Sequence, residues 1–399
     1  MLRDRNARLC LGAALVSGFG TSALWLAAGV WVKTLTGSDG LAALTFLAMW
    51  AATPFGPLLG TIADRVRRKP LLIGLNLALA AVLTALGAVG SADSLWILFA
   101  VLLAYGAAGV VQDAAEAALV SAAVDRRLLA DFNGLRMAAH EGMKLLAPLA
   151  GAVLCVRFGG GWVAVLDAVT FLLAACILSR VKVGEPSPAC RAGQSWRADT
   201  AEGVRALWGR PHLRALTLAA GAAMACAGLG SSFLYALVDD GLHHSPAFLG
   251  LLYTAQGIGS IAAGAAAGTL MHRYPPRRYA AAGITLFGAA VALRSLPYDA
   301  TALACSAAIG AGLPCVIIAA LTAVQQDVPG ALVGRAAAGA NTLLYAPNAL
   351  ALALGPALVG AVDHRTALPL IGAAAVAVGA ALAATSRPAP DRRPTGLHG

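Results

Sequence analysis

Long apolar runs alternate along the chain with short segments that hold most of the charge. Each run has roughly 20 residues or more, which is enough to cross a bilayer core of ~30 Å as a helix. The runs are continuous, whereas strands of a membrane barrel would alternate. The pattern predicts about twelve transmembrane helices, near 9–32, 41–62, 70–91, 95–121, 132–156, 161–181, 212–237, 246–271, 279–297, 301–325, 334–360 and 366–386.

Composition assigns the same class. Hydrophobic residues make up 59% of the 399 residues and charged residues only 12%, with a mean hydropathy of +0.75. These values indicate an all-α integral membrane protein. The net charge of +10 does not predict a nucleic-acid partner, because the cations lie between apolar runs and not on one basic patch.

The positions of the cations predict the orientation. If the N-terminus is cytoplasmic, most of the 29 Lys and Arg residues fall on the cytoplasmic side, as the positive-inside rule requires. The cations on the outer side are Lys33, Arg157, Arg294 and Arg365, and Lys144 lies within a span. We therefore expect a multi-pass protein of the inner (plasma) membrane with both termini in the cytoplasm.

The two halves of the chain repeat each other at an offset of 208 residues. The matching pairs are Gly56 and Gly264, Gly60 and Gly268, Asn133 and Asn341, and Pro148 and Pro356. A duplication with both termini on one side predicts two six-helix bundles related by an axis along the membrane normal. We expect bundles at 1–182 and 211–386, a cytoplasmic linker at 183–210 with a short amphipathic helix, and a cytoplasmic tail at 387–399.

A charged motif follows the second run and reads Gly60-Thr61-Ile62-Ala63-Asp64-Arg65-Val66-Arg67-Arg68-Lys69. It resembles the loop between helices 2 and 3 of the major facilitator superfamily of transporters. The resemblance implies a cytoplasmic gate in which Asp64 meets the start of helix 11 near Gly334 and holds the outward-open state. Alternatively, the cations only fix the topology. The gate residues are Gly60, Asp64, Arg65, Arg68 and Lys69.

Further stretches are similar to the macrolide-efflux, or multidrug-exporter, branch of this superfamily. They are Leu35-Thr36-Gly37-Ser38, Asn133-Gly134, and Gln325-Gln326-Asp327-Val328-Pro329 with Gly334-Arg335. The resemblance implies a secondary transporter that exports drugs or other amphipathic small molecules, by proton antiport with alternating access. It also implies hinges in helices 5 and 11, at Pro148, Gly151, Gly355 and Pro356.

Four charged residues lie inside the predicted spans 4 and 5. Asp113 and Glu116 are three residues apart, as are Glu141 and Lys144, so each pair shares a helix face. Counted from the loop between these spans, the four lie at similar depths, where an unpaired charge would be costly. We predict one buried cluster whose surplus carboxylates carry protons; the alternative is a static pair that locks the two helices. We interpret Asp167 on span 6 as structural.

Aromatic and amide side chains within apolar runs are candidates for substrate contacts. Hydrogen bonding between helices is the other explanation for each of them. Asn341 and Asn348 are seven apart and therefore share one face. The candidates are Trp25, Tyr105, Gln112, Gln256, Asn341 and Asn348.

Motifs of other protein classes are absent or out of context. The chain has no Walker loop, no His-x-x-x-His pair and no Cys-x-x-Cys arrangement, so we expect no cofactor, no metal and no enzyme activity. The stretch Gly257-Ile258-Gly259-Ser260-Ile261-Ala262 lies inside a span and predicts close helix packing. The expected partners are a small-molecule substrate, protons and the lipid bilayer, around a monomer. Uptake or exchange of a metabolite, and a non-transporting membrane enzyme or sensor, remain alternatives.

Overall fold

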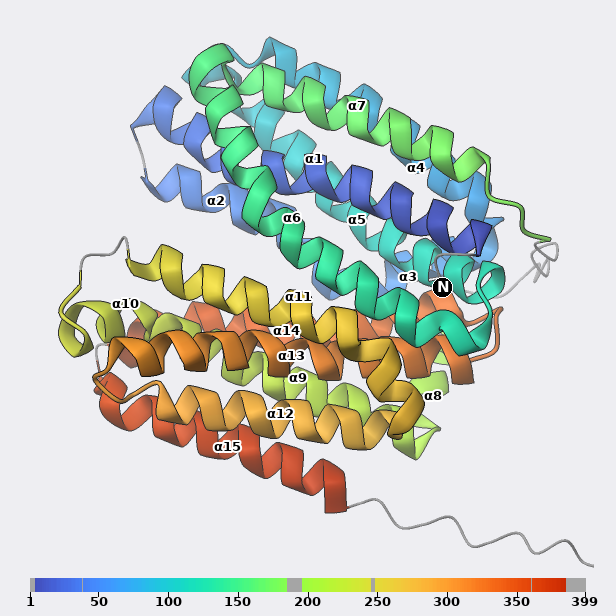
Figure 1. Ribbon diagram of the computed structural model, residues 1–399. Coiled ribbons are helices and arrows are strands. Elements are labelled where there is room, and N and C mark those ends of the chain that lie inside the picture. The colour runs from blue at the N-terminus through green and yellow to red at the C-terminus, as the bar shows by residue number, and fades with distance from the viewer. Residues whose placement is uncertain (1–3, 38, 185–195, 245–247, 360, 385–399) are drawn as a thin grey trace, which may run out of the picture.

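The computed structural model describes residues 4–37, 39–184, 196–244, 248–359 and 361–384, and these residues contain helices and no strand. Each predicted run corresponds to a helix or to a helix with a break (Figure 1). The expected all-α membrane fold is thus confirmed. The predicted tail at 387–399 and the first part of the linker lie outside the described residues.

The first half of the chain forms the upper bundle in Figure 1. Its helices are α1 (Arg5–Thr36), α2 (Asp39–Trp50), α3 (Gly56–Arg65), α4 (Arg68–Thr84), α5 (Leu95–Ala123), α6 (Leu129–Phe158) and α7 (Gly160–Ser179). Short 3-10 turns adjoin them at Thr53–Phe55, Ala85–Ala88, Ala92–Ser94 and Arg126–Leu128.

The second half forms the lower bundle, preceded by a helix from the predicted linker. That helix, α8, spans Trp196–Trp208 and contacts α14 and α3. The remaining helices are α9 (Pro211–Ser232), α10 (Leu234–Ala236), α11 (Phe248–Arg273), α12 (Pro276–Leu293), α13 (Asp299–Asp327), α14 (Val333–Val359) and α15 (His364–Ala384). A π turn at Leu237–Gly241 continues α10.

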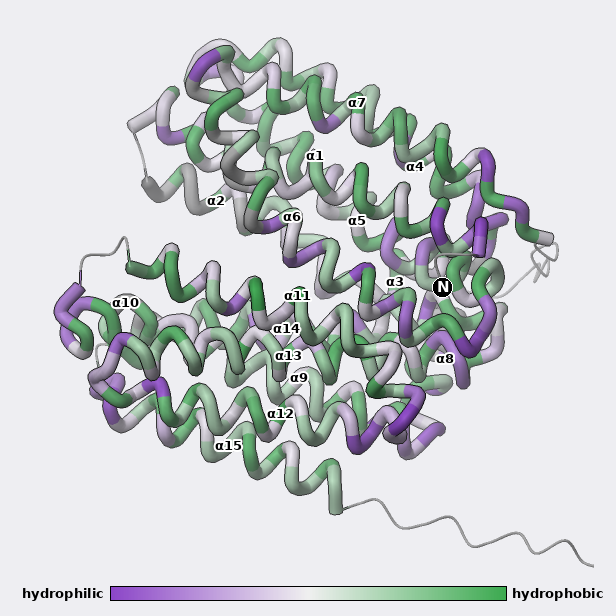
Figure 2. The backbone as a smooth tube through the Cα atoms, in the orientation of Figure 1, coloured by the Kyte–Doolittle hydropathy of each residue, from purple (hydrophilic) through white to green (hydrophobic). Residues whose placement is uncertain are grey.

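Eight of the described helices are long and apolar enough to cross a membrane. They are α1, α4 with its 3-10 extension, α5, α7, α9, α11, α13 and α15. Among the predicted spans outside this group, α6 carries several charges and the second span is broken. In Figure 2 hydrophilic residues gather at the two ends of the bundles, and a further hydrophilic stretch lies along α6.

Two proline residues explain the break in the second span. Pro54 and Pro57 lack the backbone N–H that a continuous helix needs. Pro57 stands four residues after Thr53 and so cannot donate to its carbonyl oxygen. That oxygen instead accepts a bond from Thr342 Oγ1 of α14 at 3.0 Å. A polar group left free by proline thus becomes a contact between the halves.

The two bundles use the same packing pattern. In the first, α1 contacts α6 and α7, α4 contacts α5 and α7, and α2 and α3 contact α5. In the second, α9 contacts α14 and α15, α12 contacts α13 and α15, and α11 contacts α13. If α2 and α3 count as one span and α8 and α10 are set aside, each bundle has six spans, and these contacts join the same pairs of spans in both bundles. An internal repeat requires such an equivalence.

Between the halves, α14 contacts α3 and α5, and the equivalent helix α6 contacts α11 and α13. Two equivalent crossings, α3 with α14 and α6 with α11, have the most extensive contact. Glycines allow both close approaches. A Cβ added at Gly60 would lie 2.5 Å from Ala338 Cβ, and one at Gly264 would lie 2.5 Å from Gly134 O. Both crossings lie toward the end that holds the N-terminus, and the bundles diverge toward α2 and α10 (Figure 1).

Candidate functional site

A triad of charged side chains links α5 to α6. Arg136 on α6 places Nε 3.1 Å from Glu116 Oε1 and Nη2 3.4 Å from Asp113 Oδ1, both on α5. The Arg136 side chain is 32% exposed, that of Asp113 55% and that of Glu116 14%. We call these three residues the Arg136 triad. With both acids ionised it carries one surplus negative charge.

The prediction of one buried cluster around Lys144 is wrong on two points. Lys144 Nζ contacts Glu141 Oε1 at 2.8 Å and forms a separate pair with it. The side chains of Lys144 and Asp113 are 47% and 55% exposed, so neither of them is buried. The cation shared by Asp113 and Glu116 is Arg136, which sequence reasoning counted with the cytoplasmic loop. Helix α6 begins at Leu129, which brings Arg136 about two turns into the helix.

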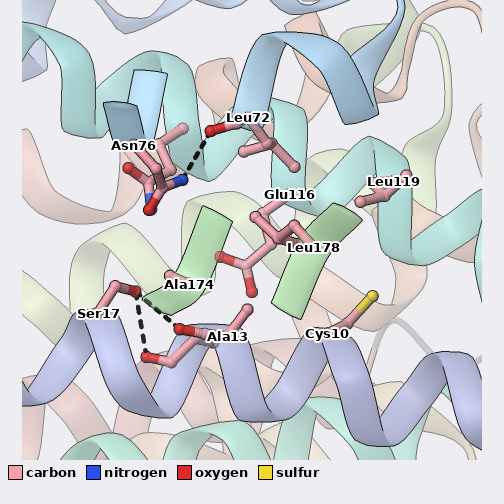
Figure 3. Close-up of a pocket in the computed structure, with 11 residues that line it drawn as sticks. Cys10, Ala13, Ser17, Leu72, Asn76, Glu116, Leu119, Ala174 and Leu178 are labelled. Atoms are coloured by element: carbon pink, nitrogen blue, oxygen red, sulfur yellow. Dashed lines mark hydrogen bonds between the residues drawn. The ribbon is translucent and has the colours of Figure 1, made fainter. Parts of the chain in front are cut away.

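A small cavity lies behind Glu116 inside the first bundle, between α1, α4, α5 and α7. Its volume is about 20 Å³, which is room for about one water-sized molecule. In the view of Figure 3 the Glu116 carboxyl group lies near the centre, with Asn76 and Ser17 on one side of it. Asn76 Nδ2 donates to Leu72 O at 2.7 Å, while its buried Oδ1 has no hydrogen-bond partner within the described chain. We call this the Glu116 cavity; its lining is Cys10, Ala13, Ala14, Ser17, Leu72, Asn76, Gln112, Glu116, Leu119, Ala174 and Leu178.

Asn133 joins the two halves at the N-terminal end. This side chain on α6 is 3% exposed. Its Nδ2 donates to Thr322 Oγ1 at 2.8 Å and to Gln325 Oε1 at 2.6 Å, both on α13. Neutral hydrogen bonds of this kind stabilise by about 1 kcal/mol each when water is excluded. Asn133 therefore favours contact between the halves at this end.

Further polar contacts surround Asn133 at the same end. Asp131 Oδ2 lies 3.3 Å from His272 Nε2 across the α6 and α11 crossing. Gln326 Nε2 donates to Arg126 O at 2.9 Å, and Arg126 donates back to Gln326 O. Arg335 at the start of α14 pairs with Glu202 of α8 at 3.2 Å. The last pair lies within the second half. We call the contacts that cross between the halves, those of Asn133, of Asp131 with His272 and of Gln326 with Arg126, the inter-half latch.

The predicted gate residues lie at this latch. Arg68 donates across the halves to Gly330 O, whereas Lys69 Nζ donates within the first half to Ser179 O and Val181 O. Arg65 is exposed. The side chain of Asp64 lies outside the described residues, so its predicted contact with helix 11 stays a prediction.

The predicted hinge glycines lie at two equivalent helix contacts. A Cβ at Gly151 of α6 would lie 2.4 Å from Ala23 O of α1, and one at Gly355 of α14 would lie 1.9 Å from Ser232 Oγ of α9. The side chains of Pro148 and Pro356 are outside the described residues. Gly151 therefore lies where α6 approaches α1, and Gly355 lies at the equivalent approach of α14 to α9.

The predicted substrate contacts occupy different surroundings. Tyr105 is buried and its hydroxyl donates to Asp167 Oδ2 at 3.0 Å. Gln112 lines the Glu116 cavity. The others are partly exposed, and their role as substrate contacts stays a prediction: Trp25, Gln256, Asn341 and Asn348.

Sequence reasoning missed the contacts that depend on the second bundle. The ring centroid of Tyr345 on α14 lies 5.9 Å from that of Trp50 on α2, and α14 also contacts α5, which carries Asp113 and Glu116. The sequence does contain features that point to Asn133 and Arg136. Asn133 matches Asn341 in the repeat, and two acids on one helix face require a nearby cation. Within the described chain, no group of three His, Cys, Asp or Glu residues could hold a metal ion.

Comparison with protein families matches the Major Facilitator Superfamily over residues 10–238 and 216–399. No curated protein matches the sequence. Similar solved structures include the human organic anion transporter MFSD10, 16% identical, with a TM-score of 0.76 over 95% of this chain and 99% of that one. A bacterial homologue of the iron transporter ferroportin, outward-facing, has 14% identity and a TM-score of 0.76 over 96% and 99%. The E. coli fucose:proton symporter has 12% identity and a TM-score of 0.74 over 96% and 100%. At these identities the likeness is one of fold.

Proposed function

Because this chain belongs to the major facilitator superfamily, it is a membrane transporter, and we propose that it exports amphipathic small molecules in exchange for protons. In this proposal the two bundles rock against each other and open the path between them to one side of the membrane at a time. The end with the inter-half latch is the cytoplasmic one, so the path is open to the outside.

The surplus acid of the Arg136 triad carries this proposal. Arg136 balances only one of Asp113 and Glu116, so the triad is neutral when it holds one proton. An uncompensated charge within a membrane domain is costly. A proton or a cationic group of a substrate can each compensate the surplus charge. Competition between the two is what antiport requires, and it favours amphipathic cations as substrates.

The position of the triad supports a coupling role. Asp113 is more than half exposed and can exchange protons with the path, whereas Glu116 is held by Arg136 and borders the Glu116 cavity. Helix α14 of the other bundle contacts α5, which carries both acids of the triad. A change in the charge of the triad therefore acts on the interface between the halves.

Efflux of ethidium, a lipophilic cation, tests this function. Cells that express the chain should accumulate less dye than control cells, and a protonophore should abolish the difference. Glu116→Gln should reduce proton-driven efflux at least about tenfold, since positioned proton transfer contributes a factor of this order or more. Asp299→Asn is the matched control, because Asp299 pairs with His244 at 2.8 Å, away from the triad.

Three results would contradict the proposal. Higher dye accumulation in expressing cells would indicate uptake. An efflux rate that is unchanged by the protonophore would exclude the proton gradient as the driving force. Loss of efflux in Glu141→Gln, with full efflux in Glu116→Gln, would move the coupling to the Glu141 and Lys144 pair.

A further inference from the structure

A second acid lies deep in the first bundle, away from the Arg136 triad. Asp167 on α7 is 0% exposed. The opposing helix α1 presents Gly20 to it, and a Cβ there would lie 2.2 Å from both Asp167 Oδ1 and Thr170 Oγ1. Only glycine leaves room for the carboxyl group at this contact. The close contact between α1 and α7 therefore depends on glycine opposite Asp167.

Hydroxyl groups connect Asp167 to α1. Tyr105 Oη on α5 lies 3.0 Å from Asp167 Oδ2 and 2.7 Å from Thr21 Oγ1. Thr21 Oγ1 in turn lies 2.9 Å from Ser17 O, one turn below. Thr21 is partly exposed while Tyr105 and Asp167 are buried. The three side chains thus form a continuous hydrogen-bonded chain from the interior to a partly exposed position, which we call the Thr21 relay.

The relay is complete in either protonation state of the acid. When Asp167 is neutral, Asp167 donates to Tyr105, Tyr105 to Thr21, and Thr21 to Ser17 O, so every hydroxyl hydrogen has an acceptor. When Asp167 is ionised, the order reverses: Thr21 donates to Tyr105, and Tyr105 donates to the carboxylate. Reversal needs only rotation of hydroxyl hydrogens, with no movement of the helices.

No cation within the described chain compensates the charge of Asp167. Its own helix presents Thr170, α1 presents Gly20 and Thr21, and α5 presents Tyr105, the one titratable group that contacts it. The hydrogen bonds of the Asp167 carboxyl group within the described chain go to Tyr105 and Thr170, and none goes to a charged residue of the neighbouring helices α4 and α6. Those charged residues are Arg68, Lys69, Asp131, Arg136, Glu141, Lys144 and Arg157. Burial of a lone carboxylate is costly, so the site favours a proton on Asp167.

We propose that Asp167 is a second proton-binding site and exchanges its proton with the translocation path through the Thr21 relay. This inference rests on the proposed proton-driven transport. To load the site, an incoming proton binds Thr21 Oγ1, the Thr21 hydrogen passes to Tyr105 Oη, and the Tyr105 hydrogen passes to Asp167 Oδ2. One O–H bond breaks and one forms at each hydroxyl, and release runs the same steps backwards.

The relay also reaches toward the triad. The backbone oxygen of Ser17 accepts a hydrogen bond from Thr21 Oγ1. Ser17 also lines the Glu116 cavity, together with Gln112 and Glu116. Gln112 stands seven residues after Tyr105 on α5, so the two share a helix face. The interior of the first bundle therefore carries polar groups between Glu116 and Asp167.

Infrared difference spectroscopy of the purified full-length protein tests the site without substrate. A pH jump should produce a C=O stretching band of a neutral carboxylic acid that is lost in Asp167→Asn. The band should remain, at a shifted frequency, in Tyr105→Phe, because its hydrogen-bond partner is removed. Glu116→Gln should leave it in place. A spectrum unchanged in Asp167→Asn would overturn the proposal, whether or not transport is proton-driven.

Proton-driven ethidium efflux tests the route. Tyr105→Phe should slow proton-driven efflux at least about tenfold, while the infrared band of Asp167 remains. Tyr279→Phe is the matched control, because Tyr279 is a buried tyrosine of the second bundle. Full efflux in Tyr105→Phe and Asp167→Asn, with the infrared band assigned to Asp167, would show a static buried acid and overturn the relay.

Discussion

Arg136 contacts two acids on a neighbouring helix, and its loss should leave both of them without this partner. Removal of one partner of a buried ion pair costs about 3–5 kcal/mol. Because Arg136 and Asp113 are partly exposed, we expect Arg136→Gln to lose less, about 1–3 kcal/mol. The measurement is thermal unfolding of the purified protein in detergent.

A double variant provides the control for that experiment. Arg136→Gln combined with Glu116→Gln removes the more buried of the two acids and should recover most of the lost stability, without recovering proton-driven efflux. Wild-type stability of Arg136→Gln alone would show that the triad has no energetic coupling.

The sequence revealed which residue types take part in the site but not which of them pair. Asp113 and Glu116 share a face by spacing alone, and this needs no knowledge of the fold. Their partner depends on where α6 begins, because a shift of one turn moves a cation by 5.4 Å along the helix. The role assigned to Asp167 had the same difficulty. Its hydroxyl partners are Tyr105 of α5 and Thr170 of its own helix, and Tyr105 in turn bonds Thr21 of α1.

At the scale of elements, hydropathy predicted the runs well because a lipid-exposed helix must be apolar along its whole length. It did not predict the interruption of the second span. Pro54 and Pro57 signalled a break, but Pro314 lies inside an unbroken α13. Which proline breaks its helix depends on the neighbours that can satisfy the freed carbonyl groups, as Thr342 does for Thr53.

The two equivalent helix crossings should both depend on their glycines. A Cβ at Gly60 would lie 2.5 Å from Ala338 Cβ, and one at Gly268 would lie 1.5 Å from Asp131 Oδ1. Overpacking of this kind costs about 1–3 kcal/mol. Gly60→Ala and Gly268→Ala should therefore loosen the inter-half latch and lengthen the distance between spin labels at the exposed positions Arg127 and Arg278.

Gly74→Ala on α4 is the matched control for the two crossings, because a Cβ there meets no atom within 4 Å. It should leave the label distance unchanged and stabilise the helix by up to about 1 kcal/mol. If Gly268→Ala gives the same distances as Gly74→Ala, the α6 and α11 crossing does not hold the halves together.

At the scale of the whole molecule, the repeat predicted the architecture but not the conformational state. Equivalent glycines and an equivalent asparagine are enough to infer two bundles with the same packing. Alternating access, however, keeps each bundle nearly rigid and changes only the contacts between them. The side that is closed depends on a few polar groups at the interface, whose pairing no periodicity reveals.

The last prediction concerns that choice of state. Asn133 donates two buried hydrogen bonds to the other half, and its loss leaves Thr322 and Gln325 without these partners. The cost is about 1–3 kcal/mol, and it falls only on the state in which the latch is closed. Since 1.4 kcal/mol is a factor of ten in an equilibrium, Asn133→Ala should shift the population toward the open latch about 5- to 150-fold.

Asn76 offers a control of the same chemistry. It is also a buried asparagine, but it donates within its own helix to Leu72 O, so Asn76→Ala should weaken the first bundle in both states alike. Spin labels at Arg127 and Arg278 should show a longer-distance population in Asn133→Ala and wild-type distances in Asn76→Ala. If the two variants give equal distance distributions, the bonds of Asn133 do not set the state. The balance would then rest on the charged contacts around it, of which Asp131 with His272 is the first to substitute.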